Sequence, residues 1–372
     1  MRYAIIVNRY PPLQGGVEFH AQNLASSLNK LGHDVWVLTI GEHPEQRNDG
    51  GVRVLVSKSC CPIADVISFP TIGATRRIVA FLETNRIDVV SVHTRFFPMT
   101  FVGLRAAKKA HIPVIHTEHG SDYVSSASPL ISAGSRMVDM TIGRYVLRGA
   151  NKVLAVSENA AIFAQRLGAR GANVFYNAIT PPKSTGEHTD QPHRLVFVGR
   201  MVEGKGWDVF LDAIARLTAE GIRVEGELLG GGLQLEEARH RVTELGLDST
   251  VAVRGRVSPD RVRESLAGAT LVNPTTLSEG FQTTLLESLA EGGRIVTYDV
   301  PGASVLAAQG HPVMICAERS VGAVVDALKH LLSDPPAQSD AAMMSEWTWP
   351  VRARQYADIA TEVVAAYRAA RR

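Results

Sequence analysis

The feature that most constrains this sequence is a regular alternation of short apolar runs with segments of helical periodicity. It opens with the apolar run Tyr3–Val7, followed by a loop that contains proline and glycine. Apolar residues then recur at steps of four and three from Val17 to Leu31, which predicts one buried face of a helix that ends at Gly32. The next apolar run is Val35–Ile40. Strands that alternate with helices predict a mainly parallel sheet with helices on both faces.

The chain contains two successive sets of alternating strand and helix segments. Between them, residues 180–193 are polar and contain proline, which predicts a linker. A length of 372 residues suits two domains. We therefore expect an α/β protein of two doubly wound domains, whose ligands bind beyond the carboxyl ends of the strands. The further strands are expected at 89–93, 114–116, 153–156, 174–176, 194–198, 224–229, 251–255, 270–273, 294–298 and 312–316, with helices near 98–110, 130–149, 207–220 and 350–370.

Composition excludes several classes of protein. Apolar residues make up 45% and charged residues 20%, as in a globular domain with a sizeable core. An apolar run of about 18 residues, the length that spans a bilayer, does not occur, and the N-terminus lacks the pattern of a signal peptide. The three cysteines, of which Cys60 and Cys61 are adjacent, fit neither a disulfide framework nor a metal site. We expect a cytoplasmic protein with reduced thiols.

Charge is distributed unevenly between the two halves. Up to residue 186 there are 20 Lys and Arg against 12 Asp and Glu, and from residue 187 there are 19 against 25. The basic half suits an anionic acceptor or a membrane surface, although an accidental imbalance explains it equally well. Segment 129–150 has the pattern of a basic amphipathic helix that lies on an anionic membrane. A helix packed on the sheet with its arginines in water is the alternative.

Four loops that follow predicted strands carry candidate chemistry. The first contains Gly15 and Gly16 and opens the first helix. Paired glycines let a ligand approach the backbone closely, and the N-terminus of a helix attracts phosphate. The loop lacks the third glycine of a dinucleotide fingerprint, which disfavours a dehydrogenase. A simple tight turn is the alternative interpretation.

In the second loop, Arg200 and Lys205 flank a glycine-bearing segment after the predicted strand 194–198. Arginine binds phosphate through two parallel hydrogen bonds, and lysine supplies a compact positive charge. The two cations at a strand end could neutralise a diphosphate leaving group, a role expected in a transferase. Two ordinary solvated cations are the alternative.

The third loop places His116, Glu118 and His119 close together in the sequence. The spacing would allow a metal site on a helix, but this segment is a strand that runs into a loop, and no third ligand is evident. We therefore expect no metal there. A histidine that hydrogen-bonds a sugar hydroxyl fits better, and for His116 a buried structural role is the alternative.

The fourth loop carries two carboxylates at a separation of eight positions, Glu279 in the loop and Glu287 in the helix that follows. One carboxylate could accept hydrogen bonds from sugar hydroxyls and the other from a ribose. Backbone amides of residues 280–283 would point to phosphates at the start of that helix. The competing interpretation is a capping box from Thr284 to Glu287, in which the carboxylate only folds back on the helix start.

These four loops, in this order, and Asn177-Ala-Ile179, where an Asn-Gly-Ile sequence is common, resemble the retaining GT4 family of GT-B glycosyltransferases over essentially the whole chain. The resemblance implies two facing Rossmann-like domains with a cleft between them. Residues 1–182 would form the acceptor-binding domain and 190–349 the nucleotide-sugar-binding domain. The last helix, 350–372, would cross back onto the first domain.

The resemblance also implies the site residues. Arg200 and Lys205 would bind the donor diphosphate, Glu279 the hydroxyls of the transferred sugar, and Glu287 the ribose. His119 would lie near the reacting sugar, so that His119 and Glu279 are the candidate catalytic residues, neither of them assigned as a nucleophile. The complete donor-binding set is Gly16, Arg200, Lys205, Glu279, Gly280, Phe281, Gln282, Thr283 and Glu287. No metal or other cofactor is expected, because the cations and the helix dipole neutralise the leaving group.

The implied reaction is transfer of a sugar, with retention, from a UDP- or GDP-sugar to a hydroxyl of a glycan, lipid-linked or small-molecule acceptor. Segments 42–75 and 121–135 are expected to be loops that recognise the acceptor, and nucleic acid is not an expected partner. Gln282 and residues 291–294 depart from the usual pattern, so the resemblance does not specify the sugar. A non-hydrolysing nucleotide-sugar epimerase and a non-catalytic sugar-binding module are the alternative functions.

Overall fold

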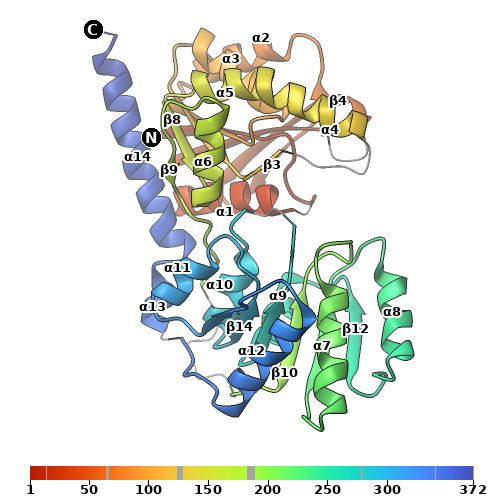
Figure 1. The fold of residues 1–372 in the computed structure, drawn as a ribbon. Helices are drawn as coiled ribbons and strands as arrows, with labels where there is room; N and C mark the ends of the chain where they lie inside the picture. The colour runs from red at the N-terminus through yellow and green to blue at the C-terminus, as the bar shows by residue number, and fades with distance from the viewer. Residues whose placement is uncertain are drawn as a thin grey trace. The chain divides into compact units, whose positions relative to one another are not determined.

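The computed structural model describes residues 1–13, 15–63, 67–123, 129–181, 189–277, 280–339 and 341–371. The chain divides into a first unit, Met1–Ala178 with Trp349–Arg372, and a second unit, Ile179–Thr348 (Figure 1). Each unit contains its own largely parallel sheet, its own helices and its own apolar core. None of the helices in the described ranges is long and apolar enough to cross a bilayer.

The first unit is built on a sheet whose strands are β1 (Arg2–Ile6), β2 (Asp34–Gly41), β3 (Glu45–Asp49), β4 (Val52–Ile63), β5 (Ile67–Pro70), β6 (Val89–His93), β7 (Val114–Glu118), β8 (Lys152–Ala155) and β9 (Asn173–Val174). Its helices are α1 (Gly16–Lys30), α2 (Ala74–Thr84), α3 (Pro98–Lys109), α4 (Pro129–Val138), the π-helix η1 (Asp139–Gly143), α5 (Arg144–Gly149), α6 (Glu158–Leu167) and α14 (Trp349–Ala369). The strand order is β3-β4-β2-β1-β6-β7-β8-β9, with β5 paired to β4. Strands β3 and β5 are antiparallel to β4, and the other pairs are parallel.

The second unit has the strands β10 (Arg194–Val198), β11 (Glu225–Leu229), β12 (Val251–Gly255), β13 (Thr270–Asn273), β14 (Arg294–Thr297) and β15 (Val313–Ile315). Its helices are α7 (Trp207–Ala219), α8 (Leu235–Glu244), α9 (Pro259–Leu266), α10 (Thr283–Ala290), α11 (Ala303–Ala308), α12 (Val321–Ser333) and α13 (Ala341–Ser345). The order β12-β11-β10-β13-β14-β15 is entirely parallel.

Both sheets have a point where the strand order reverses. In the first sheet it lies between β1 and β6, and in the second between β10 and β13. Ligands of doubly wound sheets bind outside the carboxyl ends of the strands at this point. The loops that leave β1, β6, β10 and β13 are therefore the places where each unit should carry function.

Helix α14 belongs to the core of the first unit although it is the last element of the chain. Its residues Tyr356 and Ala360 are fully buried in the same apolar cluster as Tyr3 and Leu24. The Tyr356 hydroxyl also donates a hydrogen bond of 2.7 Å to Ser91 Oγ. Figure 1 shows this helix, in dark blue, packed beside α1.

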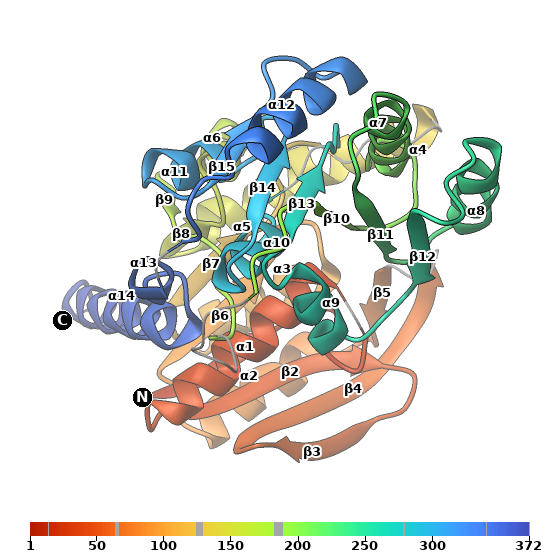
Figure 2. The same ribbon diagram turned by 90° about the horizontal axis from the view of Figure 1, so that it is seen from below.

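Two expectations about local structure were wrong. Segments 42–75 and 121–135 were expected to be loops, but the first contains β3, β4 and β5, and the second contains the start of α4 from Pro129. Figure 2 shows β3 and β4 at one edge of the first sheet. The missed signal is the alternation of Val52, Val54 and Val56, which are buried while the residues between them are half-buried. The helix expected over 130–149 is interrupted by η1, where the buried Asp139 bonds Arg95.

A buried carboxylate connects four elements of the second unit. Glu227 of β11 accepts hydrogen bonds of 2.9 Å from Arg194 of β10, 2.9 Å from Arg254 of β12 and 3.1 Å from Arg261 of α9. Burial raises the pKa of Glu227, but the hydrogen bonds from Arg194 and Arg254 outweigh it and lower the pKa to about 2. The carboxylate is therefore more stable ionised in the folded chain than in the unfolded one.

We expect the stability of this unit to fall as the pH drops from about 4.5 towards 2. A depressed carboxyl pKa contributes stability that is complete above the unfolded value and is lost as the group is protonated in the folded state. Because Arg254 and Arg261 are half-exposed, solvent screens part of their interaction with Glu227. We therefore expect the free energy of unfolding to fall by about 2 kcal/mol. Urea unfolding of the wild type and of Glu227→Gln at pH 7, 4 and 3 measures it. Identical pH dependence of the two proteins would contradict this role for Glu227.

Candidate active site

Three histidines meet at the carboxyl edge of the first sheet. His93 ends β6, His119 directly follows β7, and His20 lies on α1. The imidazole centroids of His20 and His119 are 4.7 Å apart, and those of His20 and His93 are 5.4 Å apart. His20 and His93 are buried, whereas His119 is partly exposed. The fold thus brings the predicted His119 next to the helix that Gly15 and Gly16 open.

Burial keeps these imidazoles neutral near pH 7. Desolvation is the main cause that lowers the pKa of each ring, to about 4 for His20 and well below the ordinary value for His93 and His119. The Nδ1 atom of His20 lies 2.9 Å from the side-chain oxygen of Asn177, which can only accept a hydrogen bond. The proton of His20 is therefore on Nδ1, and Nε2 carries the lone pair.

Glu118 fixes the loop that carries His119. Its Oε1 accepts hydrogen bonds from the backbone amides of His119 at 3.1 Å and Gly120 at 2.9 Å, and from Arg95 Nη1 at 2.9 Å. Burial raises the pKa of Glu118, but Arg95 and His116 outweigh it and lower the pKa to about 2. His116 is buried, and its Nε2 lies 3.1 Å from Glu118 Oε2, so the structural interpretation of His116 is correct.

The backbone of the glycine loop at the start of α1 has free space beside it. Gly15 has φ of 178°, an extended conformation that other residues adopt as well. A Cβ atom on Gly15 would meet the Glu18 carboxylate at 2.3 Å, whereas a Cβ atom on Gly16 would meet nothing within 4 Å. Neither glycine is held in a left-handed conformation, so a turn of that kind does not require them. The space beside Gly16 is open, and a ligand there stays a prediction.

In the second unit, the loops after β10 and β13 lie against each other. The Gly204 carbonyl accepts hydrogen bonds from the Thr276 amide at 2.8 Å and from Thr275 Oγ1 at 3.1 Å. Gly206 has φ of 87°, and a Cβ atom there would meet the Pro274 carbonyl at 2.4 Å, so only glycine fits. These contacts join the loop of Arg200 and Lys205 to the loop that leads to α10. Arg200 is exposed and Lys205 is half-buried.

Part of the fourth predicted loop lies outside the described residues, including Ser278 and Glu279. Helix α10 begins at Thr283, with Gln282 as the residue before it and no side-chain capping bond. Thr284 is therefore inside the helix, which rules out the capping box with Glu287. Burial raises the pKa of the half-buried Glu287.

The residues between this loop and α10 have different surroundings. The ring of Phe281 is buried and stacks on Trp347 at 5.4 Å, so a ligand could reach Phe281 only through its backbone. Gln282 Oε1 accepts a hydrogen bond of 2.6 Å from Asn273. Gly280 and Thr283 are half-buried. Backbone amides at the start of α10 are thus the groups that this segment can offer to an anion.

Sequence reasoning missed a third loop at this edge, the run Gly230-Gly231-Gly232 that follows β11. A Cβ atom on Gly230 would meet the Gly199 carbonyl at 1.8 Å, and the Met201 amide donates a hydrogen bond of 3.0 Å to the Gly231 carbonyl. This run therefore supports the backbone on both sides of Arg200. Three consecutive glycines after an expected strand were a usable signal.

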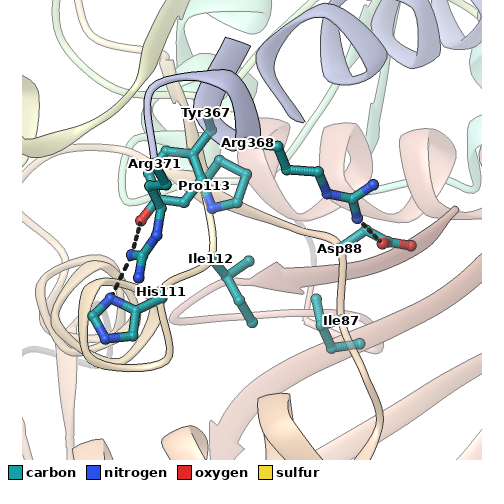
Figure 3. A pocket seen from close by; sticks show the side chains of 8 residues that line it. All are labelled: Ile87, Asp88, His111, Ile112, Pro113, Tyr367, Arg368 and Arg371. Carbon is teal, nitrogen blue, oxygen red and sulfur yellow. Dashed lines mark hydrogen bonds and ion pairs between the residues drawn. The ribbon is translucent and has the colours of Figure 1, made fainter. Parts of the chain in front are cut away.

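A hollow of about 330 Å³ in the first unit lies at the opposite edge of the sheet (Figure 3). It is lined by residues that precede β6 and β7 and by the end of α14, where Arg368 pairs with Asp88 at 2.9 Å. The amino ends of parallel strands are not where doubly wound sheets bind ligands. We therefore do not assign the substrate site to this hollow.

Comparison with solved structures defines the class of the fold. The structure of Anabaena Alr3699/HepE in complex with UDP and glucose matches with a TM-score of 0.73 and 17% identity, over 97% of this chain and 100% of that chain. Sucrose-phosphate synthase from Thermosynechococcus elongatus matches with a TM-score of 0.72 and 16% identity, over 98% and 99%. The fold is the GT-B fold of two Rossmann-like domains.

Sequence comparison gives the family. Residues 14–182 match the model of Glycosyltransferase Family 4, and residues 192–334 match Glycosyl transferases group 1. The chain is 27% identical to one subunit of phosphatidylinositol N-acetylglucosaminyltransferase from Arabidopsis thaliana, over 81% of this chain and 68% of that protein. It is 21% identical to D-inositol 3-phosphate glycosyltransferase from Corynebacterium aurimucosum, over 96% and 95%. The chain belongs to glycosyltransferase family 4 and is a transferase, which sets aside the epimerase and the non-catalytic module.

Proposed function

We propose that this enzyme transfers a sugar from a UDP- or GDP-sugar, with retention of configuration, to a hydroxyl of a lipid-linked acceptor. The observation that carries the donor part is the junction in the second unit between the Arg200–Lys205 loop and the loop that leads to α10. Two cations and a helix N-terminus at one switch point form a site suited to a diphosphate. The UDP held by Anabaena HepE supports the choice of a nucleotide donor.

The roles of the other residues follow the family resemblance. Glu279 binds hydroxyls of the transferred sugar, Glu287 binds the ribose, and residues 280–283 offer backbone amides to the phosphates. His119 contacts the reacting sugar, and Gly16 leaves room for the donor phosphate. We assign no residue as a nucleophile. The acceptor hydroxyl attacks the anomeric carbon on the face from which the diphosphate departs, the bond from that carbon to the phosphate oxygen breaks, and the departing phosphate takes the hydroxyl proton. The reaction requires no metal.

The acceptor part rests on the surface of the first unit. This unit has 24 Lys and Arg against 14 Asp and Glu, a net charge of +10. Apolar side chains on α4, η1 and α5 are exposed beside Arg136 and Arg148. They are Leu130, Ile131, Met137, Met140, Ile142 and Tyr145. Apolar side chains with basic neighbours suit an anionic membrane, and one relative is named for the phospholipid phosphatidylinositol.

The membrane proposal is tested by flotation with vesicles of phosphatidylglycerol and with vesicles of phosphatidylcholine. We expect binding to the anionic vesicles alone, and its loss in the double variant Ile131→Ser, Met137→Ser. The control is Ile162→Ser, which removes an exposed apolar side chain from α6 in the same unit and should leave binding unchanged. Absence of binding to both vesicle types overturns the membrane proposal and leaves the donor proposal standing.

The donor proposal is tested by thermal unfolding with a panel of UDP-, GDP- and ADP-sugars. Binding to the folded state alone raises the melting temperature, by a few degrees at a ligand concentration about 100 times the dissociation constant. We expect this shift with a UDP- or GDP-sugar in the wild type and its loss in Arg200→Ala. If no nucleotide sugar shifts the melting temperature, the proposed donor site is wrong.

The open space at Gly16 gives a further prediction. Gly16→Ala should fold normally, because a Cβ atom there meets nothing within 4 Å. The added methyl would occupy the space proposed for the phosphate, so that kcat/KM falls by an order of magnitude, about 1.4 kcal/mol. Gly171→Ala is the matched control, since a Cβ atom at Gly171 also meets nothing within 4 Å. Equal activity of the two variants would show that no ligand approaches Gly16.

A further inference from the structure

The three histidines of the first unit form a cluster that the proposed mechanism uses only in part. His20, His93 and His119 each offer one ring nitrogen, and these nitrogens all lie within 4.8 Å of one another. His93 Nδ1 and His119 Nε2 are 3.3 Å apart. Two nitrogens bound at about 2.0–2.1 Å to a tetrahedral zinc ion are separated by roughly the same distance. We infer that this cluster binds a divalent transition metal of the zinc class.

The orientation of His20 is that of a metal ligand held by a second residue. Its Nδ1–H donates to Asn177 Oδ1 at 2.9 Å, which leaves the lone pair on Nε2. Nε2 is buried and has no hydrogen-bond partner among the residues that the structure describes. A buried polar atom without a partner is costly, and a metal ion would satisfy it. A metal-bound histidine usually donates its other N–H to a carboxylate, a backbone carbonyl or water, and the Asn177 side-chain oxygen is an acceptor of the same kind.

His93 is supported in the same way. Its Nε2 lies 3.1 Å from Ser91 Oγ, and the Tyr356 hydroxyl donates to the same oxygen at 2.7 Å. When Nε2–H donates to Ser91, the lone pair of His93 is on Nδ1, the nitrogen that faces His119. Ser91 and Tyr356 are buried, so this arrangement is held inside the core of the unit.

The ligand set determines the class of metal. Three imidazoles without a carboxylate favour Zn²⁺, Ni²⁺ or Cu²⁺ over Mg²⁺ or Ca²⁺, which require oxygen ligands. The nearest carboxylate, Glu118, is engaged by Arg95, His116 and two backbone amides. His119 is the partly exposed member, so water can complete the fourth position.

The effect on catalysis rests on the proposed function. A metal on His119 Nε2 fixes the side chain that the mechanism places at the reacting sugar. The ion is therefore an inhibitor, and the transferase reaction itself proceeds without it. Zinc binding and sugar transfer exclude each other at this histidine.

Binding is tested first, without any activity measurement. The chain, free of affinity-tag histidines and dialysed against EDTA, is titrated with Co²⁺ alone and followed by its visible absorption. We expect one equivalent with the intense bands of four-coordinate cobalt, displaced by Zn²⁺. His20→Ala and His93→Ala should each weaken binding at least about 100-fold, and Ser91→Ala about 10- to 100-fold. His43→Ala, at an exposed histidine, should leave the affinity unchanged.

Several outcomes overturn the inference. They are absence of the cobalt bands, bands that persist in His20→Ala, or bands that disappear in His43→Ala. The metal-free melting temperature of each variant shows whether it is folded, and any unfolded alanine variant is replaced by His20→Gln or His93→Gln.

Activity is measured separately. The inhibition constant for Zn²⁺ should rise in His20→Ala by the same factor as the dissociation constant for Co²⁺. Activation by Zn²⁺ would overturn the inhibitory role. If cobalt binds as expected but no nucleotide sugar is consumed, the proposed function fails and the metal site stands. If transfer occurs and cobalt does not bind, the metal site fails alone.

Discussion

Replacement of Arg95 by methionine is expected to lower the free energy of unfolding by about 3–5 kcal/mol. Arg95 is fully buried, and so are the carboxylates that it pairs with, Glu118 at 2.9 Å and Asp139 at 2.8 Å. Methionine keeps much of the side-chain volume but leaves two buried carboxylates without their cation. Removal of one partner of a buried ion pair is far more costly than loss of a surface pair, because the charge that remains is neither paired nor hydrated by water.

Urea unfolding measures this effect, with Arg368→Met as the control. Arg368 pairs with Asp88 at 2.9 Å, the same range as the buried pairs, but its side chain is 66% exposed. The control should lose less than about 1 kcal/mol. The combined change Arg95→Met, Glu118→Gln, Asp139→Asn should recover part of the loss, because it removes the unpaired charges. A loss in Arg95→Met no larger than in Arg368→Met would contradict this account.

Some features of this protein can be predicted from its sequence alone. The steps of four and three from Val17 to Leu31 gave the helix α1, in which Ala21, Leu24 and Leu28 are buried, whereas Leu31 lies just past the end of the helix and is exposed. The alternation of apolar strand segments with helical segments also predicted that His119 and Arg200 each follow a strand, and both do. Such features depend on near neighbours in the chain. Periodicity and strand ends are encoded locally.

Burial of Arg95 could not be predicted, because its partners are 23 and 44 positions away in the sequence. An arginine is ordinarily a surface residue, and no local pattern marks this one as an exception. The cluster of His20, His93 and His119 was missed for the same reason. Its members come from α1, β6 and the end of β7, and only the pairing of β1 with β6 and β6 with β7 brings them together.

The activity of Lys205→Ala is expected to fall by a factor on the order of 10²–10³. If Lys205 neutralises the diphosphate as it leaves, its charge acts most strongly in the transition state, where negative charge accumulates on the phosphate oxygens. The loss should therefore appear in kcat as well as in kcat/KM. The fold should be retained, because the contacts of Gly204 and Gly206 with residues 274–276 fix the neighbouring backbone.

Steady-state kinetics with the donor identified by thermal unfolding separate this role from simple binding. A rise in KM at constant kcat would mean that Lys205 holds donor and transition state equally, and the leaving-group role would then be wrong. Arg216→Ala, which removes an exposed cation from α7 in the same unit, is the control and should retain wild-type kinetics. Lys205→Arg should recover only part of the activity, since a planar guanidinium cannot place its charge where a compact ammonium does. Loss of kcat in Lys205→Ala, partial recovery in Lys205→Arg and no loss in the control together require a charge at this position during departure of the phosphate.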